Sequence, residues 1–175
     1  MLQKLTELEK WHRKDDPWEY EKCPDDAKRK SVLLSEIPQR HFSNVLDIGC
    51  GQGFVTRDLP GDRVTGVDVS QEAIRKAKSF ETERLHFLHS SLFDLPRNLS
   101  GTYDLIIICG VLYPQYIGKS HSLIYQIIEG LLAPSGLLVS VHIDEWYSAR
   151  FPLLMTRQYF YEYRDYTHRL EIYVK

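Results

Sequence analysis

The sequence has few of the features that mark membrane, secreted or metal-binding proteins. Its 175 residues include three cysteines, Cys23, Cys50 and Cys109, whose spacing fits neither a metal site nor a disulfide framework. No cluster of histidine and cysteine indicates a metal. The apolar run over 105–109 is too short to cross a bilayer, and residues 1–10 lack the apolar region of a signal peptide. We therefore expect a cytoplasmic protein that binds neither a metal nor a membrane.

The sequence also lacks an excess of either charge. It carries 22 Lys and Arg against 24 Asp and Glu, for a formal net charge of −2. Because domains that bind nucleic acids usually show a basic stripe, we expect no nucleic-acid partner. The length, and the absence of internal repeats and low-complexity linkers, indicate a single domain over 1–175. We expect it to act as a monomer or a homodimer.

Segments typical of strands and helices alternate after residue 40. We expect strands over 45–48, 63–68, 85–88, 103–109 and 136–142, and helices over 2–14, 25–36, 53–59, 71–79 and 120–132. Such alternation indicates a parallel sheet with helices on both faces. The tail alternates polar with apolar residues over 157–164 and 168–174, which predicts a hairpin. The stretch 144–156 leaves room for a turn or two of helix.

A glycine-rich turn follows the first of these strands. Gly49, Gly51 and Gly53 allow a tight turn with positive φ and a close approach of the backbone to a ligand. Asp68 ends the next strand, where a carboxylate can accept hydrogen bonds from two ribose hydroxyls. The pattern therefore predicts a nucleoside cofactor.

The flanking residues indicate which cofactor this is. A dinucleotide fingerprint, G-x-G-x-x-G, needs glycine where this chain has Phe54. Asp47 precedes the turn, and its carboxylate would repel a pyrophosphate but suits an amine and a sulfonium. The segments Val-Leu-Asp-Ile-Gly-Cys-Gly-Gln-Gly (45–53) and Gly-Val-Asp-Val-Ser (66–70) closely resemble the first motifs of class I S-adenosylmethionine-dependent methyltransferases.

This resemblance implies a Rossmann-like, doubly wound α/β fold of three layers. Its seven-stranded, mostly parallel sheet would end in an antiparallel C-terminal hairpin, with a core over 41–175 and an N-terminal helical lid over 1–40. It also implies S-adenosylmethionine as cofactor. The cofactor-binding residues would be Asp47, Gly49, Cys50, Gly51, Gly53, Asp68, Val69, Ser91, Leu92, Cys109 and Gly110. Ser91 stands where many members have an acid that accepts the adenine amino group.

Several residues at strand ends are candidates for the chemistry itself. We expect His142 to be the general base, because an unperturbed histidine has a pKa near 6.5. Tyr113 and Asp144 are further catalytic candidates, although methyl transfer needs a base only when the acceptor must first lose a proton. We expect Tyr116, His121 and Glu145 near the acceptor.

The segment Asp-Pro-Trp-Glu-Tyr-Glu over 16–21 resembles nodulation-type N-methyltransferases. Trp18 and Tyr20 would belong to the lid, or else would staple the first helices to the core. The function expected is methylation of a small acceptor through an amine or a hydroxyl, sugars included. The alternatives are a methyltransferase of proteins or nucleic acids, and a catalytically weak cofactor-binding subunit or scaffold.

Overall fold

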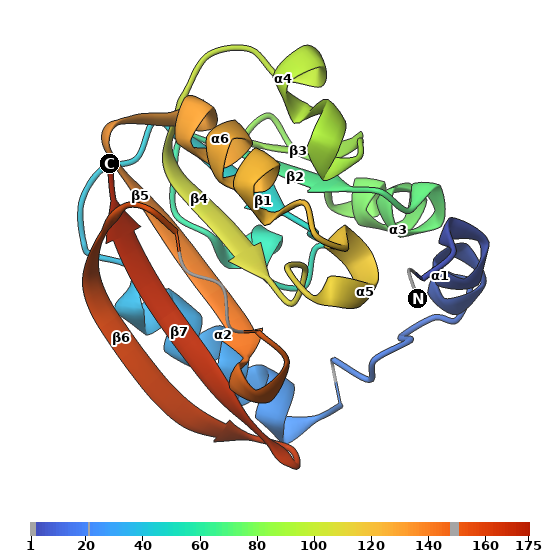
Figure 1. Ribbon diagram of the computed structural model, residues 1–175. Helices are drawn as coiled ribbons and strands as arrows, with labels where there is room; N and C mark the ends of the chain where they lie inside the picture. The colour runs from blue at the N-terminus through green and yellow to red at the C-terminus, as the bar shows by residue number, and fades with distance from the viewer. Residues whose placement is uncertain (1–2, 21, 148–150) are drawn as a thin grey trace.

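The computed structural model describes residues 3–20, 22–147 and 151–175. Their strands form one seven-stranded sheet in the order β3-β2-β1-β4-β5-β7-β6 (Figure 1). The strands are β1 (Asn44–Ile48), β2 (Arg63–Asp68), β3 (Leu85–His89), β4 (Tyr103–Cys109), β5 (Leu132–Ile143), β6 (Leu154–Tyr163) and β7 (Tyr166–Val174). The first five pair in parallel, whereas β7 runs antiparallel to both β5 and β6. The expected sheet and C-terminal hairpin are confirmed.

Helices cover both faces of the sheet. They are α1 (Leu5–His12), α2 (Pro24–Glu36), α3 (Gln71–Ala77), α4 (Leu95–Asn98), α5 (Pro114–Ile117) and α6 (His121–Leu131). Leu33 of α2 and Ile74 of α3 belong to one buried apolar cluster, and Ile124 and Ile128 of α6 belong to another. The two clusters lie on opposite sides of the sheet because side chains alternate between its faces. The three-layer arrangement is therefore confirmed.

The centre of the sheet determines where a ligand can bind. Residues 105–108 of β4 have no exposed surface, as expected for an apolar strand covered on both faces. β1 lies between β2 and β4, so the direction in which the chain adds strands reverses beside it. In open α/β sheets, ligands bind at this switch point, outside the carboxyl ends of the strands.

One expected helix does not form. The segment 53–59 consists of turns and a single 3₁₀ turn, η1 (Thr56–Asp58). Gly51 and Gly53 have φ values of +55° and +84°, which interrupt a right-handed helix, and Pro60 follows directly. The prediction of a helix there was wrong because the segment begins with Gly53, the last of the three glycines that shape the turn, and is followed by Pro60.

Other boundaries differ by a few residues. β5 begins at Leu132 rather than at 136, across a register shift opposite Tyr103 and Leu105. The hairpin strands begin earlier than expected and turn at 164–165. The described part of 144–156 contains one 3₁₀ turn, η4 (Asp144–Trp146), while 148–150 lie outside the described residues.

Candidate functional site

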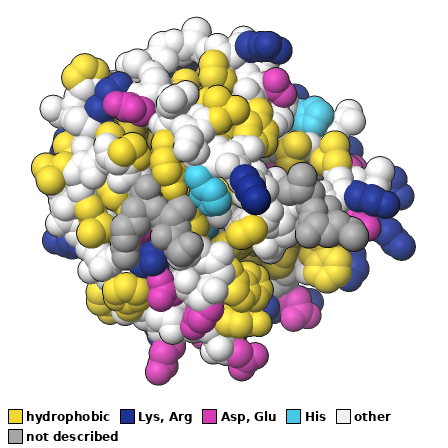
Figure 2. Space-filling view, in the orientation of Figure 1, with side chains coloured by type: hydrophobic (Ala, Val, Ile, Leu, Met, Phe, Trp, Pro, Cys, Tyr) yellow, Lys and Arg dark blue, Asp and Glu magenta, His cyan; other side chains and the backbone are white. Residues whose placement is uncertain are grey.

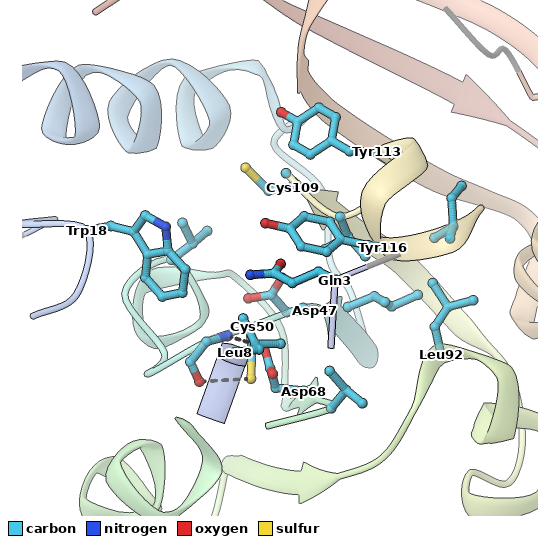
Figure 3. A pocket seen from close by; sticks show the side chains of 18 of the residues that line it. Gln3, Leu8, Trp18, Asp47, Cys50, Asp68, Leu92, Cys109, Tyr113 and Tyr116 are labelled. Carbon is cyan, nitrogen blue, oxygen red and sulfur yellow. Dashed lines mark hydrogen bonds between the residues drawn. The ribbon is translucent and has the colours of Figure 1, made fainter. Parts of the chain in front are cut away.

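A cavity of about 490 Å³ opens at the carboxyl ends of β1, β2 and β4. It lies at the switch point, and its size is typical of a small-molecule site. In Figure 3, Asp68 and Tyr113 lie at opposite ends of the labelled side chains, with Asp47 and Cys109 between them. The cavity therefore has two ends, one at Asp68 and the other at Tyr113.

The glycine turn and Asp68 form one end. One carboxylate oxygen of Asp68 accepts the Gly51 backbone N–H at 2.9 Å, and the other accepts the Ser70 N–H at 2.8 Å. These bonds fix the carboxylate beside the turn while it keeps lone pairs for a ligand. Burial raises the pKa of Asp68, although both N–H groups favour its charged form. The arrangement suits an acceptor of ribose hydroxyl protons.

This end also has room for the cofactor that the sequence implies. A Cβ on Gly51 would meet only the Cε1 atom of His12, at 4.0 Å, so the missing side chain leaves a space in the wall of the cavity. Nδ1 of His12 is buried there without a hydrogen-bond partner in the described structure. An open glycine cradle, a fixed carboxylate and an unpaired ring nitrogen together fit a nucleoside.

Asp47 stands between the two ends. It is 3% exposed, and one of its carboxylate oxygens accepts the Thr56 hydroxyl at 2.6 Å. Burial raises its pKa to about 6, since removing a carboxylate from water disfavours the charged form. Near neutral pH the Asp47 carboxylate is therefore ionised, and few neighbouring groups balance its negative charge. A cationic group bound in the cavity would be attracted to it.

The N-terminal segment covers the Asp68 end. Helix α1 lies beside α3 (Figure 1), and the Glu9 carboxylate receives the Ser70 hydroxyl at 2.9 Å and the backbone N–H groups of Gln71 and Glu72 at 2.7 and 3.1 Å. A carboxylate at a helix N-terminus satisfies free N–H groups and complements the helix dipole. At the other end of α1, the Gln3 N–H donates to the Gln115 carbonyl at 2.8 Å.

The structure brings most of the expected residues to the cavity. The expected residues that line it are Asp47, Gly49, Cys50, Gly51, Asp68, Val69, Ser91, Leu92, Cys109, Gly110, Tyr113, Tyr116, Trp18 and Tyr20. Gly53 is not among them. A Cβ there would lie 2.9 Å from Cζ of Phe87, so this glycine serves the packing of the turn on β3.

The structure places His142, the expected base, away from the cavity. The side chain is fully buried outside the cavity lining. Its Nε2 accepts the backbone N–H of Leu112 at 3.1 Å, and its Nδ1 lies 3.1 Å from the Ser140 hydroxyl. With both nitrogens engaged, and a pKa lowered by burial, it holds the loop after β4 in place.

Three further candidates also lie away from the cavity lining. Asp144 pairs with Arg169 at 2.6 Å, and Glu145 accepts the backbone N–H of Thr167 at 3.0 Å. The His121 ring packs near Tyr125, with 6.2 Å between centroids. The two acids therefore anchor η4 to β7, and none of the three candidates lines the cavity.

Aromatic rings line the end opposite Asp68. The Tyr113 hydroxyl accepts the Ile143 N–H at 2.8 Å, which leaves its own proton free to be donated into the cavity. Burial raises the pKa of Tyr113, so it is a hydrogen-bond donor rather than a base. Trp146 packs edge-on against this ring, and Tyr166 packs against Trp146.

The sequence reasoning missed several lining residues that come from distant elements. They are Gln3, Lys4, Leu8, His12, Arg29, Phe93, Trp146, Tyr163, Arg164, Tyr166 and His168, among others. For the last four residues, which run from Tyr163 to His168, the alternation of aromatic and polar residues in the tail was the one signal available. It indicated a hairpin but not that the hairpin tip reaches the cavity.

Comparison with known proteins identifies the family. The pattern of the family described as "Methyltransferase domain" matches residues 41–167. The chain belongs to this family. The expected class I S-adenosylmethionine-dependent methyltransferase fold and its cofactor are confirmed.

Individual relatives differ in what they methylate. The N-methyltransferase NodS of Bradyrhizobium japonicum, solved with S-adenosylhomocysteine, has a TM-score of 0.83 and 22% identity, covering 98% of this chain and 97% of that one. Trans-aconitate 2-methyltransferase of Paracidovorax citrulli is 32% identical over 131 residues, which are 70% of this chain and 48% of the relative. A tRNA1(Val) (adenine(37)-N6)-methyltransferase of Yersinia pestis is 30% identical over 99 residues, half of this chain and 40% of the relative. The chain thus spans less than half the length of these two relatives.

Two observations bear on other partners. No helix in the described part of the chain is long and apolar enough to cross a membrane. Over residues 3–20, 22–147 and 151–175, no group of three histidine, cysteine or acidic side chains is placed to hold a metal ion.

Proposed function

We propose that this chain transfers the methyl group of S-adenosylmethionine to a small-molecule acceptor. The observation that carries the proposal is that one cavity joins the glycine turn and Asp68 to an end lined by Tyr113, Tyr116 and Trp146. When bound, the cofactor supplies an activated methyl carbon. The main task of the protein is then to position the two reactants, which can contribute several kcal/mol.

The described residues suit that task. Asp68 and the turn hold the nucleoside, and Asp47 faces the part of the cavity between the two ends. Aromatic faces near a sulfonium contribute about 0.5–2 kcal/mol through cation–π attraction. The Tyr113 hydroxyl, fixed by the Ile143 N–H, can donate a hydrogen bond that orients an acceptor oxygen or nitrogen. An amine or a hydroxyl, sugars included, is the proposed methylated group.

Two features favour a small acceptor over a macromolecule. Helix α1 and the hairpin of β6 and β7 line the cavity from two sides, which restricts its mouth. Acidic and basic side chains are interspersed over the face of the molecule seen in Figure 2, in keeping with the formal charge of −2. A protein or nucleic-acid acceptor remains the second candidate, because tRNA methyltransferases are among the relatives.

Calorimetry and a labelled methyl donor test the proposal. We expect S-adenosylhomocysteine to bind and NAD not to bind, and we expect turnover of one class in a screen of amines, hydroxy-sugars, thiols and carboxylates. A thermal shift with NAD and none with S-adenosylhomocysteine would refute the cofactor assignment. Cofactor binding without turnover of any small acceptor, but with methylation of tRNA or protein, would refute the acceptor assignment.

A further inference from the structure

A buried cluster of charged and aromatic side chains joins α2 to the hairpin of β6 and β7. Asp26 of α2 has no exposed surface and pairs with two guanidinium groups, those of Arg29 at 3.1 Å and Arg164 at 2.6 Å. It also accepts the Tyr163 hydroxyl at 2.8 Å. Arg29 and Arg164 both line the cavity, whereas Asp26 lies behind them. The two positive charges of Arg29 and Arg164 therefore face the cavity where α2 and the hairpin line it. The cluster contains one carboxylate, that of Asp26, to balance them.

The Arg29 guanidinium has hydrogen-bonding capacity to spare. It is 7% exposed, it pairs with Asp26, and it donates to the sulfur of Cys109 at 3.3 Å and to the Tyr20 side chain. The Nε–H is buried without a hydrogen-bond partner in the described structure. Tyr20 and Tyr163 flank the group, at 4.9 and 5.8 Å from its central carbon to the ring centroids. Because a guanidinium carries five N–H donors, these three partners leave two N–H groups, the Nε–H among them, for a ligand.

His168 of β7 completes this end of the cavity. Its ring stacks on Tyr163 with 3.8 Å between centroids, and its Nδ1 lies 3.2 Å from the Tyr161 hydroxyl. Its Nε2 has no hydrogen-bond partner among the described residues. Burial, and then the charges of Arg29 and Arg164, lower its pKa to about 3, so the ring is neutral at physiological pH. This histidine therefore adds no charge to the two guanidinium groups and the one carboxylate of the cluster.

We propose that Arg29, Tyr163 and His168 form a subsite for a carboxylate carried by the methyl acceptor. This proposal rests on the proposed function, since it concerns the acceptor end of the same cavity. The three residues lie on α2, β6 and β7, which contribute none of the groups that hold the nucleoside at Asp68. A carboxylate suits the planar donors of a guanidinium, which can bind both of its oxygens. A protonated amine at this position would be repelled.

The first test is calorimetry on the protein saturated with S-adenosylhomocysteine. The probes are succinate, tricarballylate and phenylacetate, each compared with its neutral amide. We expect at least one carboxylate to bind about tenfold or more tightly than its amide. Equal affinity of each acid and its amide, or no binding of any carboxylate, would overturn the proposal while leaving the cofactor assignment intact. Failure of S-adenosylhomocysteine itself to bind would instead refute the proposed function.

The double variant Asp26→Asn/Arg29→Gln tests the residues. It removes the buried charges of Asp26 and Arg29 together, so that neither of these two is left without its partner, and Arg164, which loses the carboxylate of Asp26, is 37% exposed and can be solvated by water. We expect carboxylate affinity to fall about tenfold or more, with S-adenosylhomocysteine affinity unchanged. Arg157→Gln, which removes an exposed arginine paired with Glu36, is the matched control and should change neither. If the double variant binds carboxylates normally, the subsite is refuted. If it loses affinity for S-adenosylhomocysteine but not for methylthioadenosine, Arg29 serves the carboxylate of the cofactor, which also refutes it.

A second measurement needs no substitution. In the ¹⁵N spectrum of histidine-labelled wild-type protein, the bound carboxylate should shift the His168 Nε2 resonance. His142, buried outside the cavity lining, is the internal control and should not move. Calorimetric binding of a carboxylate without a shift at His168 would place it elsewhere and overturn the proposal, even if the double variant did not fold.

Discussion

Replacing Asp47 with asparagine should stabilise the free protein and weaken the binding of its cofactor. In the folded protein, burial raises the pKa of this carboxyl from 3.8 to about 6. Each pKa unit corresponds to about 1.4 kcal/mol, so keeping Asp47 ionised at pH 7.5 costs about 3 kcal/mol of stability. Asparagine has nearly the same shape, and its carbonyl oxygen can still accept the Thr56 hydroxyl. The variant should therefore gain up to about 3 kcal/mol in its free energy of unfolding.

The pH dependence fixes the sign of this effect. The folded-state pKa lies above the unfolded-state pKa, so the folded protein holds more protons between them and the cost of ionisation grows as pH rises through this window. The advantage of the variant should be about 3 kcal/mol at pH 7.5, about 1.6 kcal/mol at pH 5, and near zero below pH 3.8. Urea denaturation at several pH values measures it. Asp15→Asn, which replaces an exposed acid elsewhere in the chain, is the control and should not gain stability as pH rises.

Cofactor binding should move in the opposite direction. A carboxylate beside a bound cation contributes about 1.5–3 kcal/mol, so the affinity for S-adenosylmethionine should fall roughly tenfold to a hundredfold in Asp47→Asn. In wild-type protein the affinity should decline as pH falls below about 6. A variant that is less stable than wild type, or equally stable with unchanged cofactor affinity, would refute the reasoning about burial and charge at this position.

Four further changes test other parts of the cavity. Asp68→Ala should weaken S-adenosylhomocysteine binding by about 1.5–3 kcal/mol in calorimetry, because charge-assisted hydrogen bonds from the ribose are lost; unchanged affinity would place the ribose acid elsewhere. Gly51→Val should abolish binding and lower the melting temperature, since φ there is +55°. Glu9→Gln should weaken cofactor binding several-fold by loosening α1 from α3, whereas the exposed Glu7→Gln should not; equal affinities in both would leave α1 without a covering role. His142→Gln should cost about 1–3 kcal/mol of stability with turnover retained in the folded fraction, and loss of turnover without loss of stability would restore it as a catalytic candidate.

The cofactor end of the cavity could be predicted because its determinants are close together in the sequence. Asp47, Gly51 and Asp68 lie within 22 consecutive residues, on two adjacent strands and the turn between them. The φ values that this turn needs are open chiefly to glycine, so the residue types reveal the backbone. Local chemistry therefore indicated both the fold of this segment and the kind of ligand that we propose for it.

The acceptor end could not be predicted in the same way. Arg29 is flanked by Lys28 and Lys30, and sequence alone does not distinguish it from a charged residue on a solvated helix face. Its burial comes from the docking of α2 against the hairpin, more than 130 residues later. The surroundings of His142 were hidden for a related reason. Its position at the end of a strand was predicted correctly. Its Nε2, however, accepts the backbone N–H of Leu112, which lies thirty residues earlier in a loop, and this contact could not be read from the local sequence.

The two ends of the cavity differ in how easily substitutions can change them. The glycine turn, Asp47 and Asp68 are packed into the centre of the sheet, where a substitution disturbs cofactor binding and core together. The hairpin tip and Trp146 lie at the edge, on segments with exposed neighbours. Substitutions there can alter the charge and shape of the acceptor end without moving the strands that hold the cofactor. If the proposed function holds, the same cofactor site can serve acceptors of different chemistry, and the nature of the acceptor then follows from the residues of α2, β6 and β7 rather than from the motif around Gly51.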